Sequence, residues 1–440
     1  MFDPFSFVFS LIFSLWWLIL PWLLTLIVWE KFIDSLAYKN IKVFIEKNGK
    51  YTFLKLKFSG DFLINPKLME EVLIYLHANI QKEKYPEFEA IFKGKVPLPY
   101  FFIFKFHDRN LELIIGITEN ILDLLKTSLY SKYPEISFEI VENPLNDTPK
   151  DLPNFLYDIF PFGFNLKRSY AYPLKTYIYL EKLPEEERVD PLSGIWELND
   201  NISNKEWLFL IIYALPIDGD DWVPKAKEEI EKFLGIPPKP QPITLKEEIE
   251  EFIKNLLIAP FKYPEWKTIP QESSFEFSLQ KLTPLQREIL EAMERKTTKF
   301  GYLCSLLGIY IATKDLFDSG KNNLILKIVD GIFGSMGGEI FNDFSVEPKI
   351  KKGKVKFEGE VKVEEKEFMS EFKNYFLKSY YSKRINLNYY DFFRFKFLRP
   401  RFVLTTEELA TIFHHPLKQK RGEFSVKIKK TKPPFEIPTI

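Results

Sequence analysis

The stretch YFFIFKFHDRNLELIIGI, residues 100–117, has the pattern of two strands joined by a tight turn. Residues 100–106 and 111–117 are rich in Phe, Ile and Leu, which favour half-buried or buried strands. Residues 107–110, HDRN, contain the Asp and Asn that turns favour. We therefore predict a β-hairpin at the centre of the first soluble block.

Further predicted elements flank this hairpin in a regular order. Residues 51–58 alternate polar and apolar side chains, as a half-buried strand does. Asn65 offers an N-cap and Pro66 a first position for a helix with an apolar stripe. A helix at 119–133 and a strand at 136–142 complete the block. The order is the ferredoxin-like β-α-β-β-α-β plan, so the predicted fold class is α+β. This plan serves many functions.

A second α+β unit is predicted over residues 151–345. Its expected elements are strands at 175–181, 206–215 and 300–312, a helix at 224–235, a helix capped by Thr283, and helical structure around Gly320. A proline-rich break at 236–243 interrupts the unit. One interpretation is that this unit is a distant repeat of the first, which we assign to residues 32–150.

The C-terminal region, 346–440, differs in composition. Residues 346–368 are charged and alternating, which favours either a hairpin or a partly mobile insertion. Residues 372–401 are basic and aromatic, with Asp391 as their one acid. A short strand from 402 and a helix capped by Thr405 or Thr406 follow, before a basic tail.

An N-terminal membrane anchor is predicted over residues 1–31. Residues 4–29 carry no charge, and a helix of that length reaches roughly 39 Å at about 1.5 Å per residue. The hydrocarbon core of a bilayer is about 30 Å thick. A cleavable signal peptide is the main alternative, but no basic residue precedes the apolar run and no small-residue cleavage site follows it. The anchor residues are Trp16, Trp17, Pro21, Trp22 and Trp29, with Pro21 expected to kink the helix and Trp29 to lie among the headgroups.

Charge and cysteine content set the expected location. Five lysines lie between residues 31 and 50, and no basic residue precedes the span. Positive residues stay inside, so we predict an inner-membrane, single-pass protein with its bulk in the cytoplasm. The single cysteine, Cys304, excludes a disulfide within one chain. The 61 basic and 61 acidic residues balance, so overall charge does not favour nucleic acid.

Motifs for catalysis are missing from the sequence. The phosphate-binding loop G-x-x-x-x-G-K-[ST], the dinucleotide motif G-x-G-x-x-G, and the H-E-x-x-H and G-x-S-x-G signatures do not occur. The glycine-rich stretch 331–339 has no lysine and is interpreted as a flexible joint. Acidic clusters such as 218–222 are interpreted as solvated turns, and His414 with His415 as a helix end. Cys304, in an apolar run, is expected to be inert packing. We therefore predict no enzyme, catalytic residue, cofactor or metal.

The basic aromatic stretch 372–401 is the predicted partner surface. Its candidate residues are Lys378, Lys383, Arg384, Arg394, Lys396, Arg399 and Arg401. These cations suit the rim of a protein-docking surface, and the aromatics beside them suit stacking on nucleic-acid bases. A basic face near anionic lipid is a further alternative. We rank protein docking first, nucleic acid second and lipid third.

Six stretches occur together in a distinctive order. They include INPKLMEEVLIYLH (64–77), WLFLIIYALPIDGDDW (207–222) and FVLTTEELATIFHHP (402–416). The others are SLYSKYPEISFEIVE (128–142), RVDPLSGIWELND (188–200) and LTPLQREILEAMERKTTKFGYLCSLLGIYIATKDLF (282–317). The ordered set resembles the N-terminal, non-ATPase region of membrane-associated conjugation or type IV secretion-like ATPases, found especially in small-genome uncultivated bacteria. The resemblance covers roughly residues 50–440, and no motif within it is catalytic.

In that family a motor domain with a nucleotide-binding loop commonly follows this region. Here the sequence ends at TKPPFEIPTI (431–440), so no ATPase residue carries over. The resemblance implies a cytoplasmic platform that docks or organises a motor ATPase supplied by a separate chain. The expected partners are the lipid bilayer and that ATPase, with a homo-oligomer and nucleic acid as further candidates. The alternative function is a membrane-anchored nucleic-acid-binding protein that uses residues 372–401.

Overall fold

The computed structural model describes most of the body of the chain. The described residues are 50–58, 65–80, 98–149, 154–181, 190–236, 282–334, 341–347 and 402–416, with short pieces between 32 and 47, at 92–94, 152 and 337, and between 349 and 364. Within them the fold is α+β, as predicted, with an antiparallel sheet and packed helices. No helix in these ranges combines the length and the apolar character needed to cross a bilayer. The predicted anchor at 1–31 lies outside the described residues.

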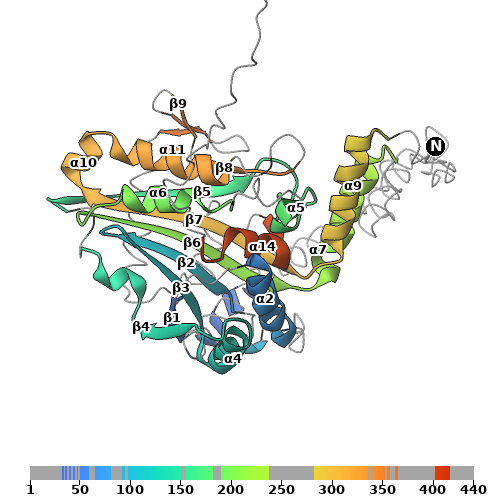
Figure 1. Ribbon diagram of the computed structural model, residues 1–440, viewed down its shortest axis with the longest axis horizontal. Coiled ribbons are helices and arrows are strands. Elements are labelled where there is room, and N and C mark those ends of the chain that lie inside the picture. Colours follow the sequence, from blue (N-terminus) through green and yellow to red (C-terminus); the bar gives the residue numbers. More distant parts are fainter. Residues whose placement is uncertain are drawn as a thin grey trace, which may run out of the picture.

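One antiparallel sheet runs through the body in the order β4-β1-β3-β2-β6-β7-β5-β8, with a ninth strand, β12, paired to β7 (Figure 1). Its strands are β1 (Tyr51–Lys57), β2 (Tyr100–His107), β3 (Asn110–Thr118), β4 (Ser137–Val141), β5 (Tyr157–Leu166), β6 (Glu206–Ile217), β7 (Gly301–Thr313), β8 (Phe344–Glu347) and β12 (Phe402–Thr405). A separate three-stranded sheet joins β9 (Lys349–Lys351), β10 (Lys354–Lys356) and β11 (Lys362–Glu364), so the predicted hairpin in 346–368 is confirmed.

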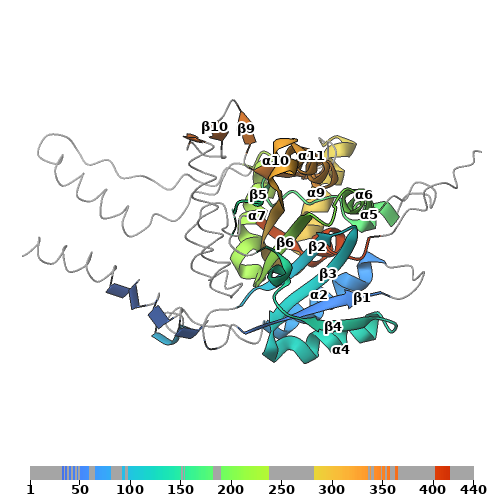
Figure 2. The same ribbon diagram turned by 90° about the vertical axis from the view of Figure 1, so that its left-hand side faces the viewer.

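Helices fill the connections between the strands. They are α2 (Pro66–Ile80), α4 (Leu122–Lys132), α5 (Tyr177–Glu181), α6 (Gly194–Asp200), α7 (Gly219–Phe233), α9 (Pro284–Thr297), α10 (Lys314–Asp318), α11 (Lys321–Phe333) and α14 (Thr406–Ile412), with 3-10 turns at Glu119–Ile121 and Pro144–Asp147. Figures 1 and 2 show α2 and α4 beside the first strands, and α6, α10 and α11 beside the later ones.

The first half follows the order β1-α2-β2-β3-α4-β4, and its strands lie in the sheet as β4-β1-β3-β2. The hairpin at its centre is confirmed, with His107 opposite Asn110. Asp108 and Arg109 turn the chain with φ values of 48° and 56°. Positive φ at both central residues is what a two-residue hairpin turn needs to match the twist of its strands.

The second half repeats the strand order of the first. Its strands lie as β8-β5-β7-β6, so first, second, third and fourth strands take the same places in both halves. The halves join where β2 pairs antiparallel with β6, from Tyr100 opposite Ala214 to His107 opposite Trp207. The repeat is imperfect because the β6–β7 connection carries the extra helices α7 and α9.

The central strands are mostly apolar because both faces of the sheet are buried. Phe102 and Phe104 belong to the core that packs under α2, α4, α6, α11 and α14. Phe101 and Ile103, one residue out of phase, belong to a second core on the opposite face with Leu145 and Leu152. Alternate residues of a strand face opposite sides, so burial of both faces explains why β2, β6 and β7 do not alternate between apolar and polar residues.

Residues 175–181 and strand β5 are two of the places where the structure differs from the sequence prediction. Residues 175–181 were predicted to be a strand, but Tyr177–Glu181 is helix α5. The Tyr177 N–H donates to Thr411 Oγ1 at 3.3 Å, so contacts with α14 override the strand preference of Tyr and Ile. Strand β5 was not predicted, because Pro161 and Gly163 interrupt its pattern as strand breakers do.

Gly308 lies where β7 passes Phe162 of β5. A Cβ at this position would lie 2.1 Å from the Phe162 ring, which is buried. We expect Gly308→Ala to lower the free energy of unfolding by about 2–3 kcal/mol, because an overfilled core forces side chains and strands apart. Urea unfolding measures the change. The control is Gly163→Ala, where the nearest atoms would be 3.8 Å away and a change within about 1 kcal/mol is expected. Equal losses in both variants would contradict the packing argument.

Candidate functional site

The C-terminal strand–helix segment, residues 402–416, is built into the middle of the body. β12 pairs with Gly301–Cys304, the first residues of β7, while β5 pairs with β7 from Leu306 onward. The chain then turns into α14, which packs on α2. Thr405 accepts from the Glu408 N–H, and the Glu408 side chain accepts from the Thr405 N–H. The predicted Thr405 cap is thus confirmed, as a reciprocal capping box.

Every residue of α14 is buried, although two of them are acidic. Phe413 lies just after the helix. The centre of its ring is 5.0 Å from the ring centres of Phe102 and of Phe104. Glu407 and Glu408 are 3% and 1% exposed. Burying a carboxylate is costly unless it is paired and hydrogen-bonded. The surroundings of these two side chains therefore define the most unusual polar site among the described residues.

Glu408 is paired with a lysine that is equally buried. The distance between Lys296 Nζ on α9 and the Glu408 carboxylate is 2.9 Å. Lys296 also donates to the Val403 carbonyl at 3.2 Å. The Leu174 N–H donates to Glu408 Oε1 at 2.8 Å. With the bond from Thr405 N–H at 2.9 Å, the carboxylate has donors on both oxygens.

Glu407 points toward the last turn of α9 and the residues just after it. Arg295 Nη2 lies 3.2 Å from Glu407 Oε1, and Lys299 Nζ lies 3.5 Å from Oε2. The Thr176 hydroxyl donates to Oε1 as well. The Arg295 guanidinium also lies 4.7 Å from the centre of the Tyr179 ring, a cation–π contact that fixes its position.

Glu70 brings α2 into the same site. Lys299 Nζ lies 2.9 Å from Glu70 Oε1, and the Thr406 hydroxyl donates to the same oxygen at 3.3 Å. The Tyr177 hydroxyl donates to Glu70 Oε2. Burial and this bond both raise the pKa of Tyr177. Burial alone would lower the pKa of Lys299, but the contacts with Glu70 and Glu407 raise it above its ordinary value.

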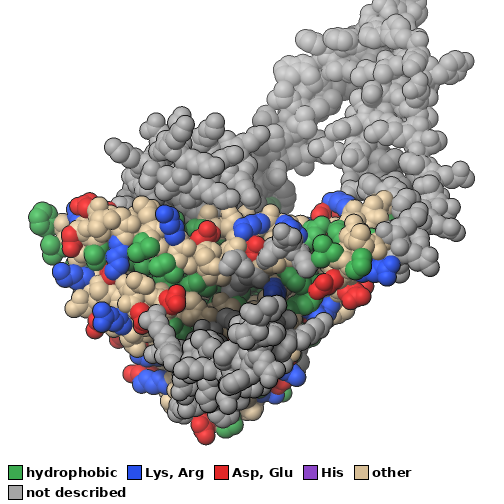
Figure 3. Space-filling view, turned by 45° about the horizontal axis from the view of Figure 1, so that its top comes forward, with side chains coloured by type: hydrophobic (Ala, Val, Ile, Leu, Met, Phe, Trp, Pro, Cys, Tyr) green, Lys and Arg blue, Asp and Glu red, His purple; other side chains and the backbone are tan. Residues whose placement is uncertain are grey.

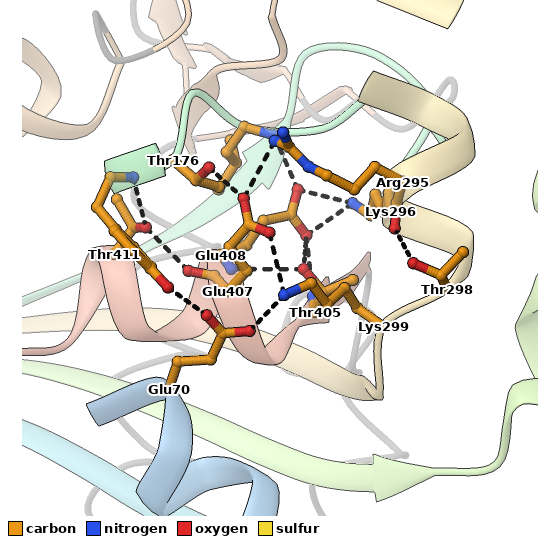
Figure 4. A network of polar contacts seen from close by, with 12 residues as sticks. Glu70, Thr176, Arg295, Lys296, Thr298, Lys299, Thr405, Glu407, Glu408 and Thr411 are labelled. Carbon is orange, nitrogen blue, oxygen red and sulfur yellow. Dashed lines mark hydrogen bonds and ion pairs between the residues drawn. The ribbon is translucent and has the colours of Figure 1, made fainter. Parts of the chain in front are cut away.

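Figure 4 shows these side chains converging from α2, α14 and the C-terminal end of α9, with Lys299 just beyond that end. We call Glu70, Arg295, Lys296, Lys299, Glu407 and Glu408 the ion cluster. Three carboxylates face three cations, so the charges balance within the site. α2 belongs to the first half of the body, α9 to the second, and α14 to the C-terminal segment. The arrangement can therefore hold three distant parts of the chain in one position.

The end of the segment is fixed by histidine and tryptophan contacts. His414 Nδ1 lies 3.0 Å from the Ala410 carbonyl, and its Nε2 lies 3.1 Å from Asp190 Oδ1. Trp196 Nε1 donates to the Pro416 carbonyl at 3.0 Å. His415 points elsewhere, against Trp196, and burial together with His414 lowers its pKa. The interpretation of the histidine pair as a helix end is confirmed.

A second buried carboxylate, Glu206, lies at the start of β6 and is 0% exposed. Lys321 Nζ on α11 lies 2.7 Å from Oε2, and the Ser203 N–H donates to the same oxygen at 2.9 Å. The Ser203 hydroxyl also donates to Oε2, and the Tyr310 hydroxyl donates to Oε1. Burial would raise the pKa of Glu206, but these four donors hold it below its ordinary value.

The residues predicted from sequence to form sites are distributed differently. All five anchor residues, from Trp16 to Trp29, and all seven cations from Lys378 to Arg401 lie outside the described residues. Asp218, in the acidic cluster 218–222, is the N-cap of α7. Cys304 is fully buried, and burial raises the pKa of its thiol, so its interpretation as packing is confirmed. Among the described residues no three His, Cys, Asp or Glu side chains form a group suited to a metal ion.

The ion cluster itself was not predicted from the sequence. Each acid of the cluster lies 108 residues or more along the chain from the bases that it pairs with. The sequence offered one signal for this site: Glu407 and Glu408 lie in a helix that has no other charged residue. Comparisons with protein-family models, curated proteins and solved structures gave no match to this chain.

Proposed function

We propose that this chain is a non-enzymatic, single-pass membrane protein whose cytoplasmic body docks or organises a separate motor ATPase of a conjugation or type IV secretion-like transfer system. The membrane part of this proposal rests on the uncharged run 4–29 and the lysines that follow it. The transfer-system part rests on the ordered resemblance over residues 50–440.

We also propose that each half of the body is a ferredoxin-like unit. The support is the strand order, β4-β1-β3-β2 in the first half and β8-β5-β7-β6 in the second. Both follow the β-α-β-β-α-β plan when α7 and α9 are counted as an insertion in the hairpin of the second unit. A fused pair of such units makes a long sheet platform on which partner surfaces keep a fixed spacing.

The observation that carries the docking proposal is the ion cluster. Its three carboxylates are paired with cations of the body itself. The cluster therefore holds residues 402–416 in place. Breaking a buried pair by losing one partner costs several kcal/mol, so a fully paired cluster favours one arrangement of α2, α9 and α14. A docking platform must hold its contact surfaces rigid, because ordering a flexible surface on binding costs free energy and so lowers the affinity.

Exposed apolar side chains offer a contact for a protein partner. Phe155 and Leu156 are 89% and 61% exposed at the tip of a turn. Asn154 Oδ1 holds this turn by accepting from the N–H groups of Leu156 and Tyr157 at 2.9 and 2.8 Å. An ordered aromatic side chain displayed to solvent suits a protein hot spot. On the face seen in Figure 3, positive and negative side chains are interspersed, which favours a protein over a polyphosphate partner.

Copurification tests the proposal. Tagged full-length chain, extracted from its own membranes in mild detergent, is expected to retain an ATPase with a phosphate-binding loop, identified by mass spectrometry. The Phe155→Lys variant should recover roughly tenfold less of it, because a charge replaces the exposed anchor. Leu324→Lys is the matched control, since Leu324 is 49% exposed on α11, and it should recover the wild-type amount. Recovery of no ATPase, or ATP hydrolysis by the purified chain alone, would contradict the proposal. Salt-sensitive DNA binding without an ATPase would favour the nucleic-acid alternative.

A further inference from the structure

Strand β4 ends the sheet on the side of the first half (Figures 1 and 2). Within the described part of the chain it pairs with β1 alone, from Phe53 opposite Val141 to Lys57 opposite Ser137. A strand paired on one side presents unpaired N–H and C=O groups on the other, which form a template for another strand. The side chains of Ser137, Glu139 and Ile140 are exposed.

The side chains beside this edge are more apolar than an edge strand usually allows. Ile140 is 62% exposed, and it shares the helix-side face of the sheet with its partner in β1, Leu54. Phe138 lies on the same face, and its ring centre is 4.6 Å from the ring centre of Tyr130 on α4. Tyr130 is itself 50% exposed. An apolar group thus borders a strand edge to which no other described strand is paired, and such edges pair with further strands unless they are protected.

We propose that β4 is a homodimer interface in which β4 pairs antiparallel with β4 of a second copy of this chain. A two-fold axis through the middle of the strand places each residue opposite its mirror position. In the register centred on Glu139, Phe138 of each copy lies opposite Ile140 of the other. Aromatic and β-branched side chains make favourable cross-strand pairs. The β4 strand of one copy is therefore complementary to the β4 strand of the other.

The chain already joins its own two halves in this way. β2 and β6, equivalent strands of the two halves, pair antiparallel at the edges where the halves meet. Pairing through β4 would repeat that mode between copies and continue the sheet across the dimer. The inference is independent of any ATPase partner, because it uses only the strand edge and the side chains beside it.

Charge sets the expected strength of the dimer. Glu139 of one copy lies opposite Glu139 of the other in this register, and like charges in opposite positions repel. Lys57 Nζ lies 2.8 Å from Glu139 within each chain and reduces that repulsion. Hydrogen bonding with Lys57, followed by its charge, lowers the pKa of Glu139, so the carboxylate is ionised at neutral pH. We therefore expect a concentration-dependent dimer that Glu139→Gln strengthens.

Disulfide trapping tests both the interface and its register. In an antiparallel pair the Cα atoms of opposite residues are about 4.5–5.5 Å apart, a separation that a disulfide bridges. Glu139→Cys is therefore expected to form a covalent dimer of the full chain under mild oxidation. Ser137→Cys is the matched control, because the two copies of residue 137 would be roughly 14 Å apart at about 3.4 Å per residue. The native Cys304 is buried and does not compete. Equal trapping of both variants, or of neither, would overturn the proposed pairing.

Sedimentation of the full chain in detergent provides a measurement without a cysteine. The protein mass is expected to double as concentration rises, and Ile140→Lys should abolish the doubling by placing a charge opposite Phe138. Leu285→Lys is the control, since Leu285 is 47% exposed on α9, and it should dimerise as wild type does. A protein that stays monomeric at every concentration would overturn the proposal, and so would an Ile140→Lys variant that still dimerises.

Discussion

Lys296→Met is expected to lower the free energy of unfolding by about 3–5 kcal/mol, the range found when a buried ion pair loses one partner. Lys296 and Glu408 have side chains 2% and 1% exposed, so water does not replace the lost cation. The Glu408 carboxylate would keep its bonds from Leu174 N–H and Thr405 N–H but lose its counter-charge. The Val403 carbonyl would also lose the lysine as a donor.

The native cysteine gives this variant a local readout. Cys304 is the only cysteine in the chain and is fully buried, and it lies opposite Phe402 where β12 pairs with β7. Release of the 402–416 segment would uncover the thiol. Lys296→Met should therefore speed thiol labelling under native conditions, in addition to shifting the urea midpoint. Lys232→Met is the control, because Lys232 forms an exposed pair with Glu229 on α7 and should change neither measurement.

A double variant distinguishes lost charge pairing from lost packing. Glu408→Gln keeps an oxygen acceptor for the two backbone donors and removes the buried charge. Adding it to Lys296→Met should recover part of the lost stability, since an unpaired carboxylate no longer remains. If Lys296→Met costs less than about 1 kcal/mol and leaves labelling unchanged, the ion cluster does not fasten the segment.

Local signals allowed much of the fold to be predicted. The hairpin at 100–117 and the caps at Thr283 and Thr405 depend on residues next to one another, and the structure confirms each. The predicted elements of the first block are all present between β1 and β4. Strand β5 was missed because Pro161 and Gly163 interrupt its local pattern, while the pairing with β7 that places it in the sheet is a long-range contact.

The ion cluster shows why sites are harder to predict than elements. Glu70 and Thr406 are 336 residues apart in the sequence, yet they share a hydrogen bond. Nothing near Glu70 distinguishes it from Glu71, which pairs with Lys132 at the surface of α2. Which of the two adjacent acids is buried depends on where α14 packs, and this position is set by tertiary contacts. The helix α5 was mispredicted for the same reason, since Thr176 and Tyr177 contact α14.

Glu206→Leu is expected to cost about 2–4 kcal/mol, because it removes the acceptor from several buried donors at once. The Ser203 N–H and the Ser203 and Tyr310 hydroxyls would each lose a bond, while Lys321 is partly exposed and can reach water. Glu206→Gln should cost less, since the amide oxygen still accepts. Glu228→Gln, exposed on α7, is the control and should leave the urea midpoint unchanged.

The pH dependence of stability gives Glu206 a second test with a defined sign. Its pKa in the folded protein is lowered, whereas the unfolded chain has the ordinary value of about 4.3. The unfolded state therefore binds the proton first as pH falls, so the contribution is full above the unfolded pKa and is lost as pH falls through the folded pKa. Wild type should lose more stability than Glu206→Gln between pH 7 and pH values below about 4. Identical losses would show that the carboxylate gains nothing from Lys321, Ser203 and Tyr310, and the account of this buried site would fail.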